Sequence, residues 1–210
     1  MTSFLVVFDV DSTLIQDEVI ELLAEYAGVR AQVQAITDRA MAGELDFAES
    51  LRGRVATLAD LPDSVIARAY EQIRITDGAE ALISAIHAAG GRVGAVSGGF
   101  SQLLTPLADR LKLDFHRAND LDVVGGKLTG RVTGEIIDKS AKARALAEWA
   151  ASCQLTTSQT VAVGDGANDL EMMAAAGLSI AFNAKPTVRE QASLVIDRPN
   201  LTELIPVLGL

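Results

Sequence analysis

Cysteine and long apolar runs are both scarce in this chain of 210 residues. Its one cysteine, Cys153, cannot form a disulfide within the chain, so nothing indicates an oxidising compartment. No apolar run approaches the roughly 20 residues of a membrane-spanning helix. The first residues also lack the basic start and the unbroken apolar core of a signal peptide. We therefore expect a soluble, cytoplasmic protein with no membrane partner.

Basic residues are fewer than acidic ones. The chain has 18 Lys and Arg against 28 Asp and Glu, a formal net charge of −10 at pH 7. Proteins that bind nucleic acid present a basic face, so this balance argues against a nucleic-acid partner. A site for an anionic substrate would need local cations of its own. In other respects the composition is typical of a globular protein, long enough for one sizeable core with a modest insertion.

The hydrophobic pattern predicts an α/β fold. Apolar runs typical of strands buried on both faces lie at 3–10, 92–96, 160–163 and 178–182. Amphipathic helical segments alternate with strands over most of the chain. This predicts a doubly wound, mostly parallel, Rossmann-like sheet with helices on both faces. Residues 114–120 are predicted to form a short strand, followed by a hairpin around Gly125 and Gly126.

Residues 15–75 interrupt this alternation between the first strand and the second. The helical periodicity predicts no strand there but four helices, at 17–28, 29–43, 47–58 and 61–73. We therefore predict two units. Residues 1–14 and 76–210 form an α/β core, and residues 15–75 form a small inserted helical cap.

Three predicted strands end in residues that a buried strand does not need. Asp9 and Asp11 follow the first strand, SGG at 97–99 follows the second, and GDGAND at 164–169 follows a later one. Ligands of open parallel sheets bind beyond the carboxyl ends of the strands. Residues i and i+2 of a strand point to the same side. Asp9, Asp11 and Asp165 are therefore predicted to converge in one pocket.

Three converging carboxylates would repel one another without a cation. These segments offer oxygen ligands and neither histidine nor cysteine, which favours Mg²⁺ over zinc. The glycines permit close approach to a phosphate, and Ser97 adds a hydroxyl donor at a predicted helix N-terminus. Any one of these residues alone is more often a turn or cap residue. Their occurrence at successive strand ends favours a metal and phosphate site.

Two basic residues are predicted to face inward on their helices. Lys142 aligns with Leu146 and Trp149, where a lysine is ordinarily a snorkelling stem unless a phosphate lies nearby. Arg54 lies on the apolar stripe of its helix. This favours either recognition of a carboxylate or phosphate, or a structural ion pair with an acid of the cap. Glu18 flanks an apolar stripe in a first helical turn, where the helix dipole also favours acids.

Together these residues resemble the haloacid dehalogenase superfamily. DVDST at 9–13 is similar to its D-x-D-x-[TV] nucleophile motif, and SGG, Lys142 and GDGAND resemble the remaining motifs in order and spacing. Within the superfamily, essentially the whole chain is similar to the phosphoserine phosphatases. The segments that carry this likeness are FDVDSTLI, SLRGRV, VSGGFSQLLTPLADRLKLD, GKLTG and VAVGDGANDLEMMAAAGLSIAFNAKP.

The resemblance implies a role for each acid of the motifs. Asp9 would be the nucleophile that forms an aspartyl-phosphate, and Asp11 would protonate the leaving oxygen and then activate water. Mg²⁺ would be held by Asp9, the backbone carbonyl of Asp11 and Asp165, with Asp169 supporting.

It also implies how a phosphorylated amino acid would be bound. The residues implied to contact it are Glu18, Arg54, Ser97, Gly98, Lys142 and Asn168. Ser97, the Gly98 amide and Lys142 would stabilise the phosphoryl oxygens. Glu18 would pair with the ammonium and Arg54 with the carboxylate, while the cap closes over the substrate.

The resemblance therefore implies Mg²⁺-dependent hydrolysis of O-phospho-L-serine to L-serine and phosphate, the last step of serine biosynthesis. Transfer of the phosphoryl group to another alcohol such as homoserine, or hydrolysis of another small phosphomonoester, are the alternatives. A sensor of phosphate or metal without turnover is disfavoured, because binding does not need the second acid, Asp11. We expect a monomer or homodimer. We also expect no N-terminal regulatory domain, since the first strand starts by about residue 4.

Overall fold

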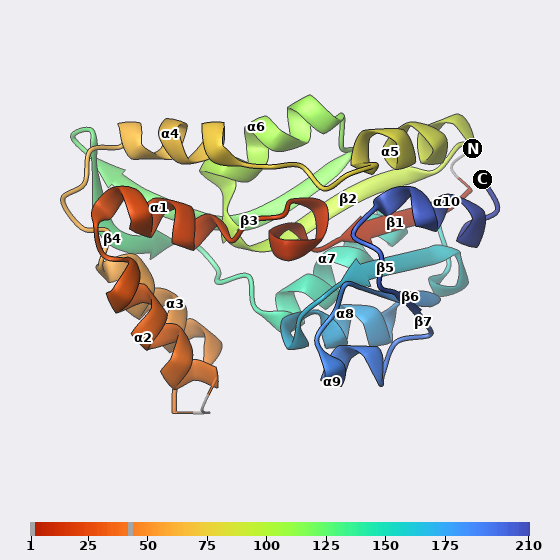
Figure 1. Cartoon of the computed structure of the whole chain (residues 1–210). Coiled ribbons are helices and arrows are strands. Elements are labelled where there is room, and N and C mark those ends of the chain that lie inside the picture. Colours follow the sequence, from red (N-terminus) through yellow and green to blue (C-terminus); the bar gives the residue numbers. More distant parts are fainter. Residues whose placement is uncertain (1–2, 42–43) are drawn as a thin grey trace.

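The computed structural model describes residues 3–41 and 44–210. Its centre is a seven-stranded sheet of order β4-β3-β2-β1-β5-β6-β7 (Figure 1). The strands are β1 (Leu5–Phe8), β2 (Arg92–Phe100), β3 (Phe115–Val124), β4 (Lys127–Thr133), β5 (Thr160–Gly164), β6 (Leu178–Phe182) and β7 (Leu194–Ile196). Every neighbouring pair is parallel except β3 and β4, which are antiparallel. The predicted α/β fold with a mostly parallel sheet is confirmed.

Helices cover both faces of this sheet (Figure 1). On one face lie α5 (Ala79–Ala88), α6 (Ser101–Leu111) and α10 (Leu204–Val207), and on the other α7 (Lys139–Ser152), α8 (Leu170–Ala175) and α9 (Pro186–Arg189). Val6 and Phe8 of β1 belong to the first core, and Leu5 and Val7 belong to the second. The central strand is therefore covered on both sides, which explains its unbroken apolar run.

Four helices lie between β1 and α5, the helix that precedes β2. They are α1 (Val19–Ala27), α2 (Arg30–Met41), α3 (Phe47–Ala56) and α4 (Ser64–Gln72). All four predicted helices of this region are therefore found, although residues 42 and 43, at the predicted end of the second, lie outside those described. The hairpin-like pair α2 and α3 extends away from the sheet, while α4 lies beside α6 (Figure 1).

The two stretches of chain that connect this helical segment to the rest of the fold lie side by side. Ile15 forms an antiparallel bridge with Ile75, and the Gln16 N–H donates to the Arg74 carbonyl at 2.8 Å. The Arg74 guanidinium also binds the Asp17 carboxylate, with Nη2 to Oδ1 at 2.6 Å. A short two-stranded ribbon thus joins the helical segment to the sheet.

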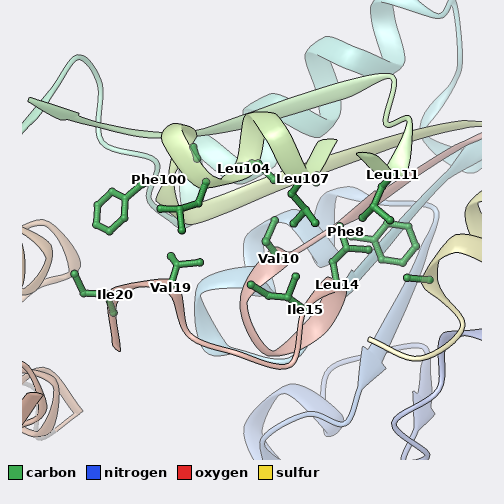
Figure 2. Packing of buried hydrophobic residues seen from close by; sticks show 14 of the residues in the cluster. Phe8, Val10, Leu14, Ile15, Val19, Ile20, Phe100, Leu104, Leu107 and Leu111 are labelled. Atoms are coloured by element: carbon green, nitrogen blue, oxygen red, sulfur yellow. The ribbon is translucent and has the colours of Figure 1, made fainter. Parts of the chain in front are cut away.

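Apolar side chains anchor the turn that follows β1 to the hydrophobic core. Val10 and Leu14 are buried, and they pack with Leu104 and Leu107 of α6 in one cluster, as Figure 2 shows. The Ile15 N–H donates to the Val10 carbonyl at 3.0 Å, which closes a wide turn. The backbone that carries Asp9 and Asp11 is therefore fixed by packing against the core.

Two strand boundaries differ from the prediction. β2 does not end at residue 96 but continues through 97–99 to Phe100, so Ser97 lies within a strand and the prediction of a helix N-terminus there was wrong. The reason is that Phe100 still pairs with β3 beyond an irregularity. β3 is one strand of 10 residues, not a short strand and a separate hairpin arm. It pairs first with β2 and then with β4. No described helix is both long and apolar enough to cross a membrane.

Candidate active site

A buried lysine links two of the acids at the carboxyl edge of the sheet. Lys142 on α7 is 0% exposed, and its Nζ donates to Asp9 Oδ1 at 2.5 Å and to Asp169 Oδ1 at 2.7 Å. Burial alone would lower the pKa of Lys142, but the adjacent Asp169 and Asp9 carboxylates raise it above its ordinary value. The ammonium therefore stays charged inside the protein and does not extend to solvent, as a snorkelling lysine would.

Asp169 makes more contacts within the acidic cluster than the sequence indicated. Its Oδ2 accepts from the backbone N–H groups of Asp165 at 3.2 Å and Gly166 at 3.0 Å, while its Oδ1 binds Lys142. Asp9, Asp165 and Asp169 each place a carboxylate oxygen within 4.8 Å of the others. In the sequence its signal is its place at the end of GDGAND, and the family resemblance implies a role in support of the metal ligands.

Crowding of these acids shifts their protonation. Burial, and then the Asp169 charge, raise the pKa of Asp9 to about 8 despite the opposing Lys142. The same two causes raise the pKa of Asp165 to about 6, although Thr13 Oγ1 donates to it at 3.3 Å. An added divalent cation would relieve this repulsion and favour the ionised carboxylates.

The donor set fits a hard divalent cation. The clustered ligand atoms are carboxylate oxygens, with no histidine or cysteine among them. Nearby, Asp11 Oδ1 is buried and has no hydrogen-bond partner in the described part of the chain. Burial, and then the charges of Glu18 and Asp9, raise the pKa of Asp11 well above its ordinary value. Asp11 is therefore suited to carry a proton.

The glycines at 98 and 99 allow close approach of other groups. A Cβ on Gly98 would lie 3.0 Å from the Phe47 ring, and one on Gly99 would lie 2.5 Å from Val19 and 3.4 Å from Asp11 Oδ2. The Ser97 hydroxyl accepts from the Gly99 N–H at 2.7 Å. This segment is thus packed against both the first acidic turn and the inserted helices.

A cleft of about 840 Å³ opens between the inserted helices and the edge of the sheet. Seven of the predicted site residues line it: Asp9, Asp11, Glu18, Arg54, Gly98, Asp165 and Asn168. Ser97 and Lys142 are buried and do not line it. The structure thus brings the predicted residues together at this cleft. Seven of them line it, and Ser97 and Lys142 are buried behind the lining residues.

Opposite charges stand on the helical side of this cleft. Glu18 is exposed, and its Oε1 accepts from the Ser12 hydroxyl at 2.7 Å. The Arg54 Nε donates to the Ser50 carbonyl at 3.3 Å, and no carboxylate of the described residues lies within ion-pair distance of it. Burial holds the pKa of Arg54 below its ordinary value despite Glu18 and Asp11. Among the described residues, Arg54 therefore does not form the alternative, a structural ion pair with an acid of residues 15–75.

Sequence reasoning missed three residues at this site. Lys139 and Lys185 line the cleft, and Lys139 pairs with Glu171 at 2.9 Å. Lys185 follows β6 within a segment quoted for the family resemblance, but nothing in its spacing marked it. Asn119 is buried beneath the segment 97–99. Its position depends on strand pairing that the sequence does not state.

Comparison with known proteins identifies a family model and relatives that agree with one another. A family model for haloacid dehalogenase-like hydrolases matches residues 6–174. The chain is 54% identical over 206 residues to the phosphoserine phosphatase of Streptomyces coelicolor, covering 98% of the chain and 50% of the relative. It is 51% identical over 204 residues to that of Streptococcus thermophilus, covering 97% and 95%.

Coverage differs between these relatives. The chain spans about half the length of the Streptomyces coelicolor enzyme and of phosphoserine phosphatase SerB2 from Mycobacterium tuberculosis, which is 54% identical over 99% of the chain. A solved structure described as a phospho-aspartyl intermediate analogue of phosphoserine phosphatase superposes with a TM-score of 0.93 at 42% identity, covering 99% of both chains. A substrate-bound phosphoserine phosphatase complex gives the same values.

Proposed function

Because this chain belongs to the haloacid dehalogenase-like hydrolases and, within them, to the phosphoserine phosphatase family, we propose that it hydrolyses O-phospho-L-serine to L-serine and phosphate with Mg²⁺. In a cell this would be the last step of serine biosynthesis. The supporting observation is that the two acids Asp9 and Asp11 share one cleft with Glu18 and Arg54. One cleft thus contains both the acids proposed to react at phosphorus and the charged residues proposed to bind the amino acid.

The first half of the reaction uses both acids of the turn. Lys142 holds one carboxylate oxygen of Asp9, which leaves the other to attack phosphorus. The bond from phosphorus to the serine oxygen breaks, and Asp11 gives its proton to that oxygen. The raised pKa of Asp11 suits this role, because the carboxyl group must arrive protonated.

The second half returns the enzyme to its starting state. Asp11, now ionised, takes a proton from water, and the hydroxide attacks the phosphorus of the aspartyl-phosphate. The bond from phosphorus to the Asp9 oxygen breaks, so inorganic phosphate leaves and Asp9 is regenerated. Ser97, the Gly98 N–H and Lys142 balance the charge of the phosphoryl oxygens throughout.

We propose Asp9, Asp165 and the Asp11 carbonyl as the residues that would hold Mg²⁺, with Asp169 fixing Lys142 and the backbone at 165–166 beside them. When bound, Mg²⁺ neutralises charge on the phosphoryl group and on the crowded acids. The cluster of carboxylate oxygens, without histidine or cysteine, supports this assignment.

We also propose that residues 15–75 act as a cap on a core of residues 1–14 and 76–210. Glu18 and Arg54 belong to this segment and line the cleft, so closure would place them on the amino-acid part of the substrate and exclude water. A cytoplasmic location and a monomeric or homodimeric state stay predictions.

Phosphate release from a panel of small phosphomonoesters, with and without Mg²⁺, tests the proposal. We expect the highest kcat/KM for phosphoserine and loss of activity without a divalent cation. Asp9→Asn should abolish turnover, while the exposed Asp109→Asn on α6 serves as a control and should not. Full activity in Asp9→Asn would contradict covalent catalysis. Formation of phosphohomoserine on addition of homoserine would favour a phosphotransferase instead.

A further inference from the structure

The strand segment that holds the proposed phosphate donors is irregular. Val96 on β2 pairs with Arg117 on β3, and Phe100 pairs with Asn119. Residues 97–99 of β2 therefore face a single residue of β3, so this bulge lacks a regular ladder of backbone hydrogen bonds. Two of the three are glycines, whose backbone is unusually free. Some other group must fix their conformation.

The Asn119 side chain supplies the missing hydrogen bonds. It is 1% exposed, and its Nδ2 donates to the carbonyl oxygens of Gly98 at 2.9 Å and Gly99 at 3.3 Å. Its Oδ1 accepts from the Ile137 N–H at 2.8 Å. The amide therefore uses both hydrogens and its oxygen, which fixes its orientation. One side chain ties the bulge of β2 to the segment that leads into α7.

These bonds also constrain the backbone beside the two proposed phosphate donors, the Ser97 hydroxyl and the Gly98 N–H. The peptide between Gly98 and Gly99 presents its carbonyl to Asn119 and its N–H to Ser97 Oγ. Because Ser97 Oγ accepts that bond, its own hydrogen is left to donate to another acceptor. Asn119 itself is not among the described residues that line the cleft. It acts on the site only through the backbone it holds.

We propose that Asn119 is a positioning residue for phosphoryl recognition, which holds the segment 97–99 so that the Ser97 hydroxyl and the Gly98 N–H are ready to receive phosphoryl oxygens. The inference rests on the proposed phosphate-binding role of those two groups. It predicts an effect on the phosphate end of any substrate and no selective effect on the amino-acid end.

The test compares phosphate binding with catalysis in Asn119 variants. Asn119→Leu removes all three hydrogen bonds, and the isosteric Asn119→Asp keeps an acceptor for the Ile137 N–H but loses the donors. For both, we expect calorimetry with Mg²⁺ to show roughly tenfold weaker binding of inorganic phosphate, as for loss of a buried hydrogen-bond partner. The kcat/KM for phosphoserine and for phenyl phosphate should fall by the same factor.

Thr160→Val is the matched control. Thr160 is also buried, and its hydroxyl donates to the Thr157 carbonyl and accepts from the Gly177 N–H at the far end of β5. This variant should lower the melting temperature without changing phosphate affinity. Wild-type phosphate affinity in a folded Asn119→Asp protein would overturn the inference, even if its melting temperature fell. Wild-type protein that binds phosphate but does not hydrolyse phosphoserine would instead overturn the proposed function.

Discussion

At the scale of single residues, the site depends on charges that are buried beside one another. Lys142 lies between Asp9 and Asp169, and each partner compensates a charge that would otherwise be costly to bury. The sequence predicted the inward direction of Lys142 from its helical stripe. It could not predict that Asp169 completes the arrangement, because that contact joins the loop after β5 to α7.

Arg54 provides the sharpest prediction at this scale. Replacement of Arg54 by Gln removes the proposed partner of the substrate carboxylate, so kcat/KM for phosphoserine should fall by roughly 100-fold, as for loss of a charge-assisted pair. O-phosphoethanolamine keeps the ammonium but lacks the carboxylate, so its kcat/KM should change little. Arg52→Gln, an exposed residue on the same helix, is the control and should behave as wild type. An equal loss for both substrates would contradict the assignment.

At the scale of elements, the apolar runs predicted the positions of strands and helices better than their ends. β1, β5 and β6 lie where uninterrupted apolar residues place them, because burial on both faces leaves a clear pattern. The bulge in β2 is different. Residues 97–99 look like a loop from composition, and only pairing of Phe100 with Asn119 keeps them in the strand.

The ribbon at the base of the inserted helices carries a second prediction. Arg74→Gln removes the contact of the Arg74 guanidinium with Asp17 beside Glu18, and linkers of this kind absorb the motion of a closing cap. We expect kcat and KM to change together by roughly two- to fivefold, with little change in melting temperature because Arg74 is exposed. Steady-state kinetics and thermal unfolding measure both quantities.

Arg189→Gln is the control, because it breaks another arginine–aspartate ion pair, with Asp197 just beyond β7. Its kinetics should match those of the wild type. If Arg74→Gln also leaves kcat and KM unchanged, the ribbon does not influence the cap.

At the scale of the whole molecule, the proposed substrate is anionic while the protein itself carries a formal net charge of −10. Local cations resolve this, with Lys142 behind the cleft wall and Arg54, Lys139 and Lys185 lining the cleft. The sequence identified the first two from their helical faces, but the lysines at the rim required the folded arrangement. The crowded acids have a further consequence for global stability.

Without a divalent cation, stability should fall as pH rises from about 4 to about 8. The pKa values of Asp9 and Asp165 are raised from 3.8 to about 8 and about 6, so the folded state binds more protons than the unfolded state in this range. Mg²⁺ should therefore raise the melting temperature by several degrees at pH 8 and much less at pH 5. Calorimetric unfolding measures this, and Asp165→Asn should remove most of the increase. An equal effect of Mg²⁺ on the melting temperature at both pH values would contradict the assignment of Asp9 and Asp165 as Mg²⁺ ligands.

The central claim is that Asp9 becomes phosphorylated during turnover, and peptide mass spectrometry after rapid acid quenching tests it most directly. With phosphoserine and Mg²⁺, we predict a phosphoryl group on the peptide that contains Asp9, released by hydroxylamine as an acyl phosphate should be. Asp9→Asn should show no such group. Turnover of phosphoserine with no phosphorylated peptide, or with the label on another residue, would contradict the account.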